Sequence, residues 1–131
     1  MKLQRMRFSN DCSVASVSMV LRRPYEEVLK VAIANKFNPD SPVGIDVYSL
    51  LHYCGYDCSC RIYIRALGLR PIPMKQPIIV SIPSLNNYKG RHAVVIQQGR
   101  VYDPSNRRRA SFNYVTRNRG HMYYNFRKET I

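Results

Sequence analysis

The sequence predicts an α+β domain in which N-terminal helices pack on a C-terminal antiparallel sheet. Residues 12–54 carry apolar side chains at helical spacing, whereas the chain from Tyr56 onward carries the alternating and continuous apolar runs of strands. The pattern changes once, at Gly55. A length of 131 residues is enough for one domain with a single core. We therefore expect residues 1–131 to form a single domain.

Three helices are expected in the first half of the chain. Residues 12–22 follow Asn10 and Asp11, either of which suits an N-cap, and their nearly continuous apolar character indicates a central, buried helix. A second helix begins near Pro24, a residue favoured in the first turn. Apolar residues recur at helical spacing over residues 47–54, which predicts a third helix.

The second half of the chain is expected to form the sheet. Residues 56–64 alternate in polarity like a half-buried strand, and the apolar run 78–82 is typical of a strand covered on both faces. Residues 92–96 and 100–102 flank Gln98-Gly99 as a hairpin. Polar or proline-bounded connections are expected at 71–77 and 84–90. About the last thirty residues are expected to form further strand, with a turn near Arg119-Gly120.

The chain is strongly basic. It contains 21 Lys and Arg against 8 Asp and Glu, a formal net charge of +13. This excess favours an acidic partner, which could be a nucleic acid, an anionic cell envelope or an acidic protein, although a solvated basic face remains the alternative. The arginines of the tail are interleaved with aromatic residues, which fits base stacking and an alternating strand equally well. The candidate acidic-partner residues are Arg107, Arg108, Arg109, Arg117 and Arg119.

The cysteines do not indicate a disulfide framework or a metal centre. Cys54, Cys58 and Cys60 cluster near His52, but their spacing is not that of a repeated pair of zinc ligands. Strand alternation places Cys58 and Cys60 on one face, where buried free thiols are common. We expect reduced cysteines, no metal and no cofactor.

No segment approaches the ~20 consecutive apolar residues that a membrane-spanning helix requires. The basic N-terminus, MKLQRMRF, is not followed by an apolar run of signal-peptide length. We expect a soluble protein without a signal peptide or transmembrane segment, located in the cytoplasm or associated with a virion.

The residues that carry chemistry are Cys12, His92 and Asp103. Cys12 lies at the predicted start of a helix, where unpaired N–H groups and the helix dipole favour a thiolate. If Gln98-Gly99 is a two-residue turn, the hairpin register places Asp103 diagonally across from His92, within side-chain reach. The carboxylate then holds one imidazole nitrogen and leaves the other for the thiol. This arrangement predicts a thiol hydrolase.

Four segments of the chain are NDCSVASVSMVL, GIDVYSLLHYCGYD, QPIIVSI and GRHAVVIQQGRVYDPS, in this order. Together they resemble the double-glycine leader peptidases, the bacteriocin-processing branch of the papain-like cysteine peptidases. The resemblance spans about residues 4–106 and implies a papain-like fold. It also implies Cys12 as nucleophile, His92 as general base and later acid, and Asp103 as the residue that orients the imidazole.

The chain departs from that family at the oxyanion hole. The family has a Gln six residues before the Cys, and Met6 occupies that position here. Gln4 and Asn10 are the candidate side-chain donors in its place, beside the backbone N–H of Cys12. Loss of one oxyanion donor costs on the order of 100- to 1000-fold in rate, so activity depends on a substitute.

Three functions are therefore open. The first is a small cysteine peptidase that hydrolyses peptides or proteins through an acyl-enzyme. The second is a peptidoglycan endopeptidase of papain-like fold, because Asp11-Cys12-Ser13 looks like the opening of such enzymes, although Val14 replaces their following Gly. The third is a catalytically weak papain-like binding or structural module in a viral particle or nucleic-acid assembly.

Overall fold

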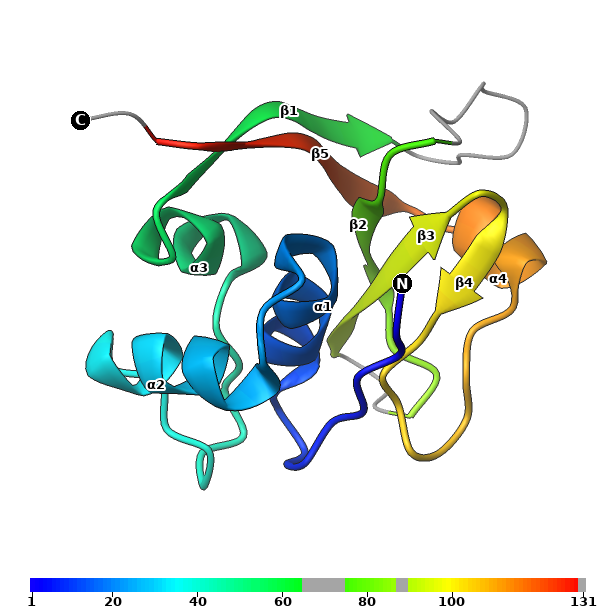
Figure 1. The fold of residues 1–131 in the computed structure, drawn as a ribbon. Coiled ribbons are helices and arrows are strands. Elements are labelled where there is room, and N and C mark those ends of the chain that lie inside the picture. Colours follow the sequence, from blue (N-terminus) through cyan, green and yellow to red (C-terminus); the bar gives the residue numbers. More distant parts are fainter. Residues whose placement is uncertain (65–74, 87–89, 130–131) are drawn as a thin grey trace.

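The computed structural model describes residues 1–64, 75–86 and 90–129, except for the side chains of residues 59–64. Within these ranges, three helices are followed by strands, and a short fourth helix precedes the last strand (Figure 1). The helices are α1 (Cys12–Leu21), α2 (Tyr25–Ala34), α3 (Val47–Tyr53) and α4 (Phe112–Arg117). The strands are β1 (Tyr56–Ile64), β2 (Ile78–Pro83), β3 (Arg91–Gln97), β4 (Arg100–Tyr102) and β5 (Gly120–Lys128).

The strands form one antiparallel sheet in the order β1-β5-β2-β3-β4. The last strand, β5, thus lies between β1 and β2 (Figure 1). Gly120 begins β5 where the strand passes β2, and a Cβ on this residue would lie 2.8 Å from the carbonyl oxygen of Ser81. The close approach of these two backbones therefore requires glycine at position 120.

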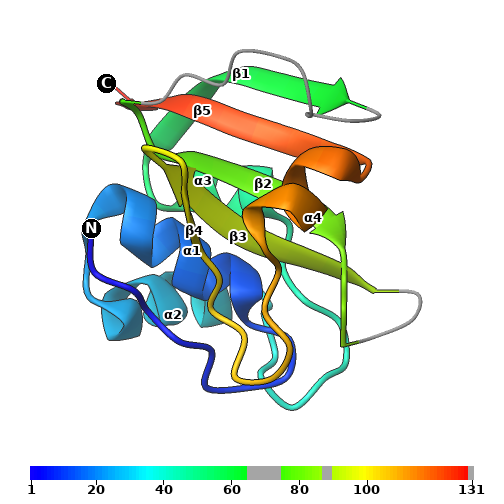
Figure 2. The same cartoon turned by 90° about the vertical axis from the view of Figure 1, so that its right-hand side faces the viewer.

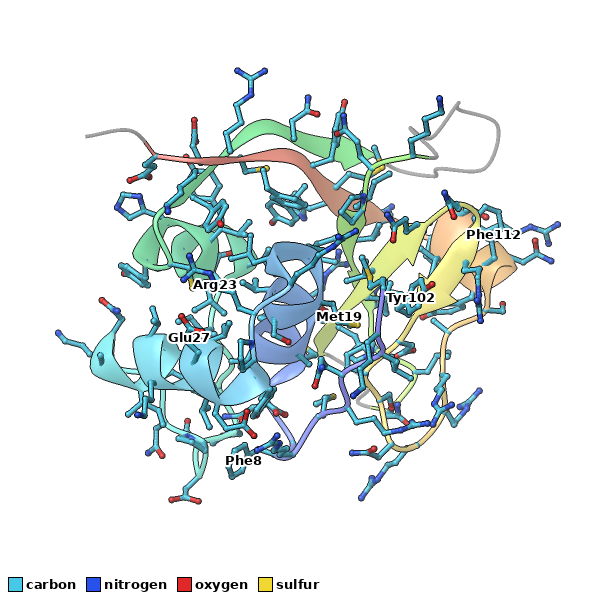
Figure 3. The ribbon with its side chains drawn as sticks, viewed as in Figure 1. Phe8, Met19, Arg23, Glu27, Tyr102 and Phe112 are labelled. Atoms are coloured by element: carbon cyan, nitrogen blue, oxygen red, sulfur yellow. The ribbon has the colours of Figure 1, made fainter. Side chains whose placement is uncertain are left out.

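The sheet is covered on both faces. Helices α1, α2 and α3 lie on one face, and α4 lies on the other, which Figure 2 brings toward the viewer. The helix α1 is almost entirely buried against β3, as its apolar sequence predicts. The core on the α1 side includes Val14, Val17, Met19, Leu50, Ile79 and Val95, with Tyr102 packed against it; Figure 3 labels Met19 and Tyr102. The core on the α4 side includes Ile78, Val80, Ile82, Val94, Val115 and Met122.

The predicted α+β class, with N-terminal helices and a C-terminal antiparallel sheet, is confirmed. The expectation of strand throughout the last part of the chain is wrong, because residues 112–117 form α4. Ser111 caps this helix by accepting a hydrogen bond from the backbone N–H of Tyr114, and Val115 enters the core. The segment is too short for its helical period to stand out from the surrounding alternation.

The first nine residues form an extended N-terminal arm that contacts both the helices and the sheet side of the molecule. The backbone N–H of Met6 donates to the carbonyl oxygen of Pro104 at 2.9 Å, and Asn106 Nδ2 donates to the Met6 carbonyl oxygen at 2.7 Å. On the helix side, Arg7 Nη2 lies 2.5 Å from Glu26 Oε1. The arm thus links the start of α2 to the loop that follows β4. Phe8, at its far end, is labelled in Figure 3.

The longest helices in the described ranges, α1 and α2, have ten residues each. None of the described helices reaches the length and apolar character needed to cross a bilayer.

Candidate active site

A cleft of about 1210 Å³ lies between the N-terminus of α1 and the sheet. We call the side supplied by residues 6–13 and 42–47 the helix wall, and the side supplied by β2, β3, β5 and residues 105–107 the sheet wall. Cys12 belongs to the helix wall and His92 to the sheet wall. The cleft is therefore the place where the predicted nucleophile and the predicted base face the same space.

Cys12 is the first residue of α1 and is partly exposed. Asp11 precedes it at the N-cap position but makes no capping hydrogen bond to the helix. Its fully buried carboxylate instead accepts hydrogen bonds from the backbone N–H groups of Arg7 (2.8 Å) and Phe8 (3.1 Å) and from the hydroxyl of Tyr25. Burial and this contact with Asp11 raise the pKa of Tyr25 above its ordinary value. The Asp11 carboxylate therefore leaves the first-turn N–H groups beside Cys12 uncapped.

His92 and Asp103 form a buried hydrogen-bonded pair. His92 Nε2 donates to Asp103 Oδ1 at 2.6 Å. The same carboxylate accepts the backbone N–H of Ser105 at 2.8 Å and that of Ala110 at 2.7 Å. Burial acts to raise the pKa of Asp103, but the contacts with His92 and these two N–H groups outweigh it and hold the pKa below its usual value. Asp103 is thus an ionised anchor for both the imidazole and the loop after β4.

The imidazole of His92 lies between a carboxylate and a thiol. Burial acts to lower the pKa of His92, but hydrogen bonds with Asp103 and Cys12 prevail and raise it from 6.5 to about 9. Because Nε2 is bound to Asp103, Nδ1 is the nitrogen left for Cys12. The positively charged imidazole is therefore the favoured form at neutral pH, in contact with the sulfur.

The hairpin that carries this pair has the predicted register. Gln97 pairs with Arg100, and Val95 pairs with Tyr102. Gln98 and Gly99 form the turn, both with positive φ angles, 51° and 76°. The predicted diagonal contact between His92 and Asp103 is confirmed by their hydrogen bond.

Ser16 fixes the position of α1 relative to β3. It lies one turn after Cys12, and its hydroxyl donates to the carbonyl oxygen of Ala93 at 3.2 Å. Ala93 is the neighbour of His92 in β3. Both ends of this hydrogen bond are buried, so it ties the helix that carries the thiol to the strand that carries the imidazole.

Neither candidate side-chain oxyanion donor is placed to serve. Asn10 lies on the helix wall, but its side-chain NH2 group donates to three carbonyl oxygens, and its Oδ1 is buried without a partner among the described residues. Asn10 thus anchors a loop and is not a free donor. Gln4 is outside the lining of the cleft, whereas Met6 contributes to it. The carbonyl groups bound by Asn10 are those of Asn38 (3.0 Å), Ser41 (2.5 Å) and Val43 (3.1 Å).

The five candidate arginines have different local surroundings. Arg107 lines the cleft. The guanidinium groups of Arg108 and Arg109 bind the carbonyl oxygens of Leu85 (3.4 Å) and Ser105 (3.1 Å) and so hold the loop after β4. Arg117, in α4, and Arg119, after it, are outside the cleft lining. Of the five candidates, only Arg107 lines the cleft.

The thiols of Cys54 and Cys58 lie apart from the cleft lining. Burial raises the pKa of Cys54, and the thiol of Cys58 donates to the carbonyl oxygen of Tyr124 at 3.2 Å. His52 pairs with Glu129 at 3.0 Å, and the side chain of Cys60 falls outside the described residues. In the described part of the chain, no three His, Cys, Asp or Glu side chains gather as metal ligands would.

Sequence reasoning missed the roles of Asp11, Tyr25 and Ser16 in building the site. The hydroxyl of Ser16 could have been noticed, because it lies one helical turn from Cys12 on a helix that is largely apolar. The Asp11 network could not, because it depends on how the N-terminal arm folds back. Comparison with family models, with curated proteins and with solved structures returns no significant match, so the geometry of the site carries its interpretation.

Proposed function

We propose that this chain is a small cysteine peptidase of papain-like fold. The observation that carries the proposal is the position of His92, held by Asp103 at 2.6 Å on one side and in contact with Cys12 on the other, within an open cleft. A nucleophile, a base and an orienting carboxylate in series are the parts that acyl transfer requires.

The proposed reaction begins with the Cys12 thiolate and the His92 imidazolium. The sulfur attacks a peptide carbonyl, and the tetrahedral oxyanion is stabilised by first-turn N–H groups of α1, including that of Cys12. His92 gives its proton to the leaving amine as the C–N bond breaks, which leaves a thioester on Cys12. His92 then takes a proton from water while the resulting hydroxide attacks the thioester. Breakage of the C–S bond releases the acid product and restores the thiolate–imidazolium pair.

Asp103 has a positioning role in this scheme. Its hydrogen bond to Nε2 keeps Nδ1 directed at the sulfur, and its charge favours the imidazolium that pairs with a thiolate. The backbone N–H groups of Ser105 and Ala110 hold the carboxylate itself, so the orientation of the imidazole rests on a fixed loop.

Selective alkylation of Cys12 tests the proposal before any substrate is known. Iodoacetamide at pH 6, followed by peptide mapping, should label Cys12 at least about ten times faster than Cys54 or Cys58, because a thiolate reacts and a buried thiol does not. His92→Ala should slow the labelling of Cys12 itself, whereas the exposed control His52→Ala should leave its labelling rate unchanged. Equal, slow labelling of the three cysteines would contradict the proposal.

Substrate assays then separate the two hydrolases. Cleavage of peptide pools that is lost in Cys12→Ala supports the peptidase, whereas release of stem peptides from purified peptidoglycan alone supports the endopeptidase. A non-enzymatic papain-like module is the third candidate, favoured because neither Gln4 nor Asn10 offers a free side-chain oxyanion donor in the cleft. It predicts no cleavage and a labelling rate of Cys12 that does not depend on His92.

A further inference from the structure

The two walls of the cleft carry different charges. The sheet wall contains Arg91 and Arg107, and none of its described lining residues is Asp or Glu. Among the described helix-wall residues that line the cleft there is one carboxylate, that of Asp46, and none of them is Lys or Arg. This carboxylate is occupied as the N-cap of α3 through the backbone N–H (3.0 Å) and hydroxyl (3.1 Å) of Ser49. Positive charge is therefore concentrated on one side of the space that a substrate would enter.

The two sheet-wall arginines are not neutralised within the described part of the chain. Arg107 is exposed, and its guanidinium has no ion pair or hydrogen bond with any described residue. Arg91 Nη2 donates to the carbonyl oxygen of Ser81 at 2.6 Å, which uses one donor of the guanidinium and adds no negative charge. Both side chains thus retain donors and charge for an incoming anion.

The position of Arg107 is coupled to the proposed catalytic groups. It lies between Ser105 and Ala110, whose N–H groups both bind the carboxylate of Asp103. Asn86 clamps the same loop, because its Nδ2 donates to Ser105 Oγ (3.1 Å) and its Oδ1 accepts the backbone N–H of Arg108 (3.1 Å). Figure 3 shows side chains that end in nitrogen atoms, drawn in blue, along this loop between β4 and α4. The cation is therefore presented by a fixed loop.

We propose that the sheet wall selects acidic peptides, with Arg91 and Arg107 binding the carboxylate of an Asp or Glu close to the scissile bond. This inference rests on the proposed peptidase function and names its substrate class. It also locates a specific role for part of the chain's positive charge, because Arg108 and Arg109 hold the loop and Arg117 lies in α4, outside the cleft. A carboxylate that meets two guanidinium groups gains specificity from their planar donor geometry.

Cleavage-site profiling tests the selection. The wild-type chain is incubated with a proteome-derived peptide pool, and the residues flanking each new terminus are counted by mass spectrometry. We expect Asp and Glu to be enriched on one side of the cut. Arg107→Glu should lower kcat/KM for the best acidic peptide by roughly five- to thirtyfold and favour Lys or Arg at the same position. Arg117→Glu changes the charge equally outside the cleft and should leave the profile unchanged.

A binding measurement keeps this inference separate from the peptidase proposal. Cys12→Ala is titrated with fluorescent acidic and charge-reversed peptides, with and without Arg107→Glu. Circular dichroism first shows that each variant is folded. Wild-type cleavage with no acidic preference would overturn the inference and leave the peptidase intact. If no peptide is cleaved but acidic peptides bind and Arg107→Glu weakens that binding, the peptidase proposal would be overturned and the proposed selection of acidic peptides would be supported.

A nucleic acid is the competing acidic ligand. If Arg107→Glu abolishes retention of the Cys12→Ala chain on a single-stranded oligonucleotide but leaves acidic-peptide affinity unchanged, the sheet wall serves nucleic acid and the inference is overturned. If oligonucleotide retention falls equally in Arg107→Glu and Arg117→Glu while peptide affinity falls only in the former, the acidic-peptide assignment is supported.

Discussion

Replacing Asp103 with asparagine should lower the pKa of His92 and reduce the stabilisation that the folded chain gains from protonation of His92. The amide keeps the volume of the carboxylate but removes its charge. Three N–H groups now donate to the Asp103 carboxylate, and at least one of them would face the NH2 group of the amide, which cannot accept a hydrogen bond. The change removes the first of the causes that raise the pKa of His92, while the burial that lowers it remains. We expect the pKa of His92 to fall from about 9 by roughly one unit or more.

The same change has a calculable effect on folding. A rise from 6.5 to about 9 in the pKa of His92 corresponds to about 3 kcal/mol in the free energy of unfolding. Because the folded-state pKa is raised, this stabilisation is complete below about pH 6.5 and is lost as the pH rises through about 9. The fall of roughly one unit or more expected in Asp103→Asn removes about 1.4 kcal/mol or more of this stabilisation, so the variant should be destabilised by at least about 1.4 kcal/mol more near pH 6 than near pH 10.

The assay combines NMR titration of the His92 ring with urea unfolding at the two pH values. The His92 resonance is identified by its loss in His92→Gln. Asp46→Asn is the matched control, because that carboxylate also borders the cleft but caps α3. An unchanged pKa of His92 in Asp103→Asn, or a destabilisation that is equal at pH 6 and pH 10, would refute the reasoning.

Three further predictions concern the scaffold of the site. Ser16→Ala should lower the unfolding free energy by about 1 kcal/mol and slow alkylation of Cys12, because α1 loses its hydrogen bond to Ala93. The control Ser18→Ala removes only a hydrogen bond to Ala15 within α1 and should leave the alkylation rate of Cys12 unchanged. Asp11→Ala should cost about 3 kcal/mol in urea unfolding, because two backbone donors and Tyr25 lose their acceptor; a loss below that of Tyr25→Phe would contradict this account. Gly120→Ala should lower the unfolding free energy by about 1 to 3 kcal/mol in urea unfolding, because a Cβ would lie 2.8 Å from the Ser81 carbonyl oxygen. An unchanged unfolding midpoint would show that β5 and β2 can move apart to accept the methyl group, and would contradict this prediction.

The first three helices and the hairpin could be predicted because their signals are local. The helical spacing of apolar residues around Leu50 and the turn at Gln98-Gly99 can each be recognised within a few residues of sequence. The register of the hairpin then follows from the position of the turn and the alternation of side chains along a strand. The contact between His92 and Asp103 was predictable for this reason, since the hairpin places the two residues on neighbouring strands at its open end.

Features that depend on distant contacts could not be predicted. The insertion of β5 between β1 and β2 requires pairing of Tyr56 with Lys128, and no local pattern specifies that choice. The engagement of Asn10 with the carbonyl oxygens of the loop 38–43 is equally non-local, and so the sequence left it as an oxyanion candidate. Likewise, two adjacent arginines look alike in the sequence, which gave no sign that Arg108 would hold a loop while Arg107 would border the cleft.

The N-terminal arm has a consequence for the order in which the molecule matures on the ribosome. Met6 is synthesised a hundred residues before Asn106, the partner that holds its carbonyl group. Domains generally form as units, and contacts this distant in sequence close late. Nascent chains therefore carry Cys12 without its finished surroundings until Asn106 has left the ribosome, and any hydrolytic power is postponed at least until then.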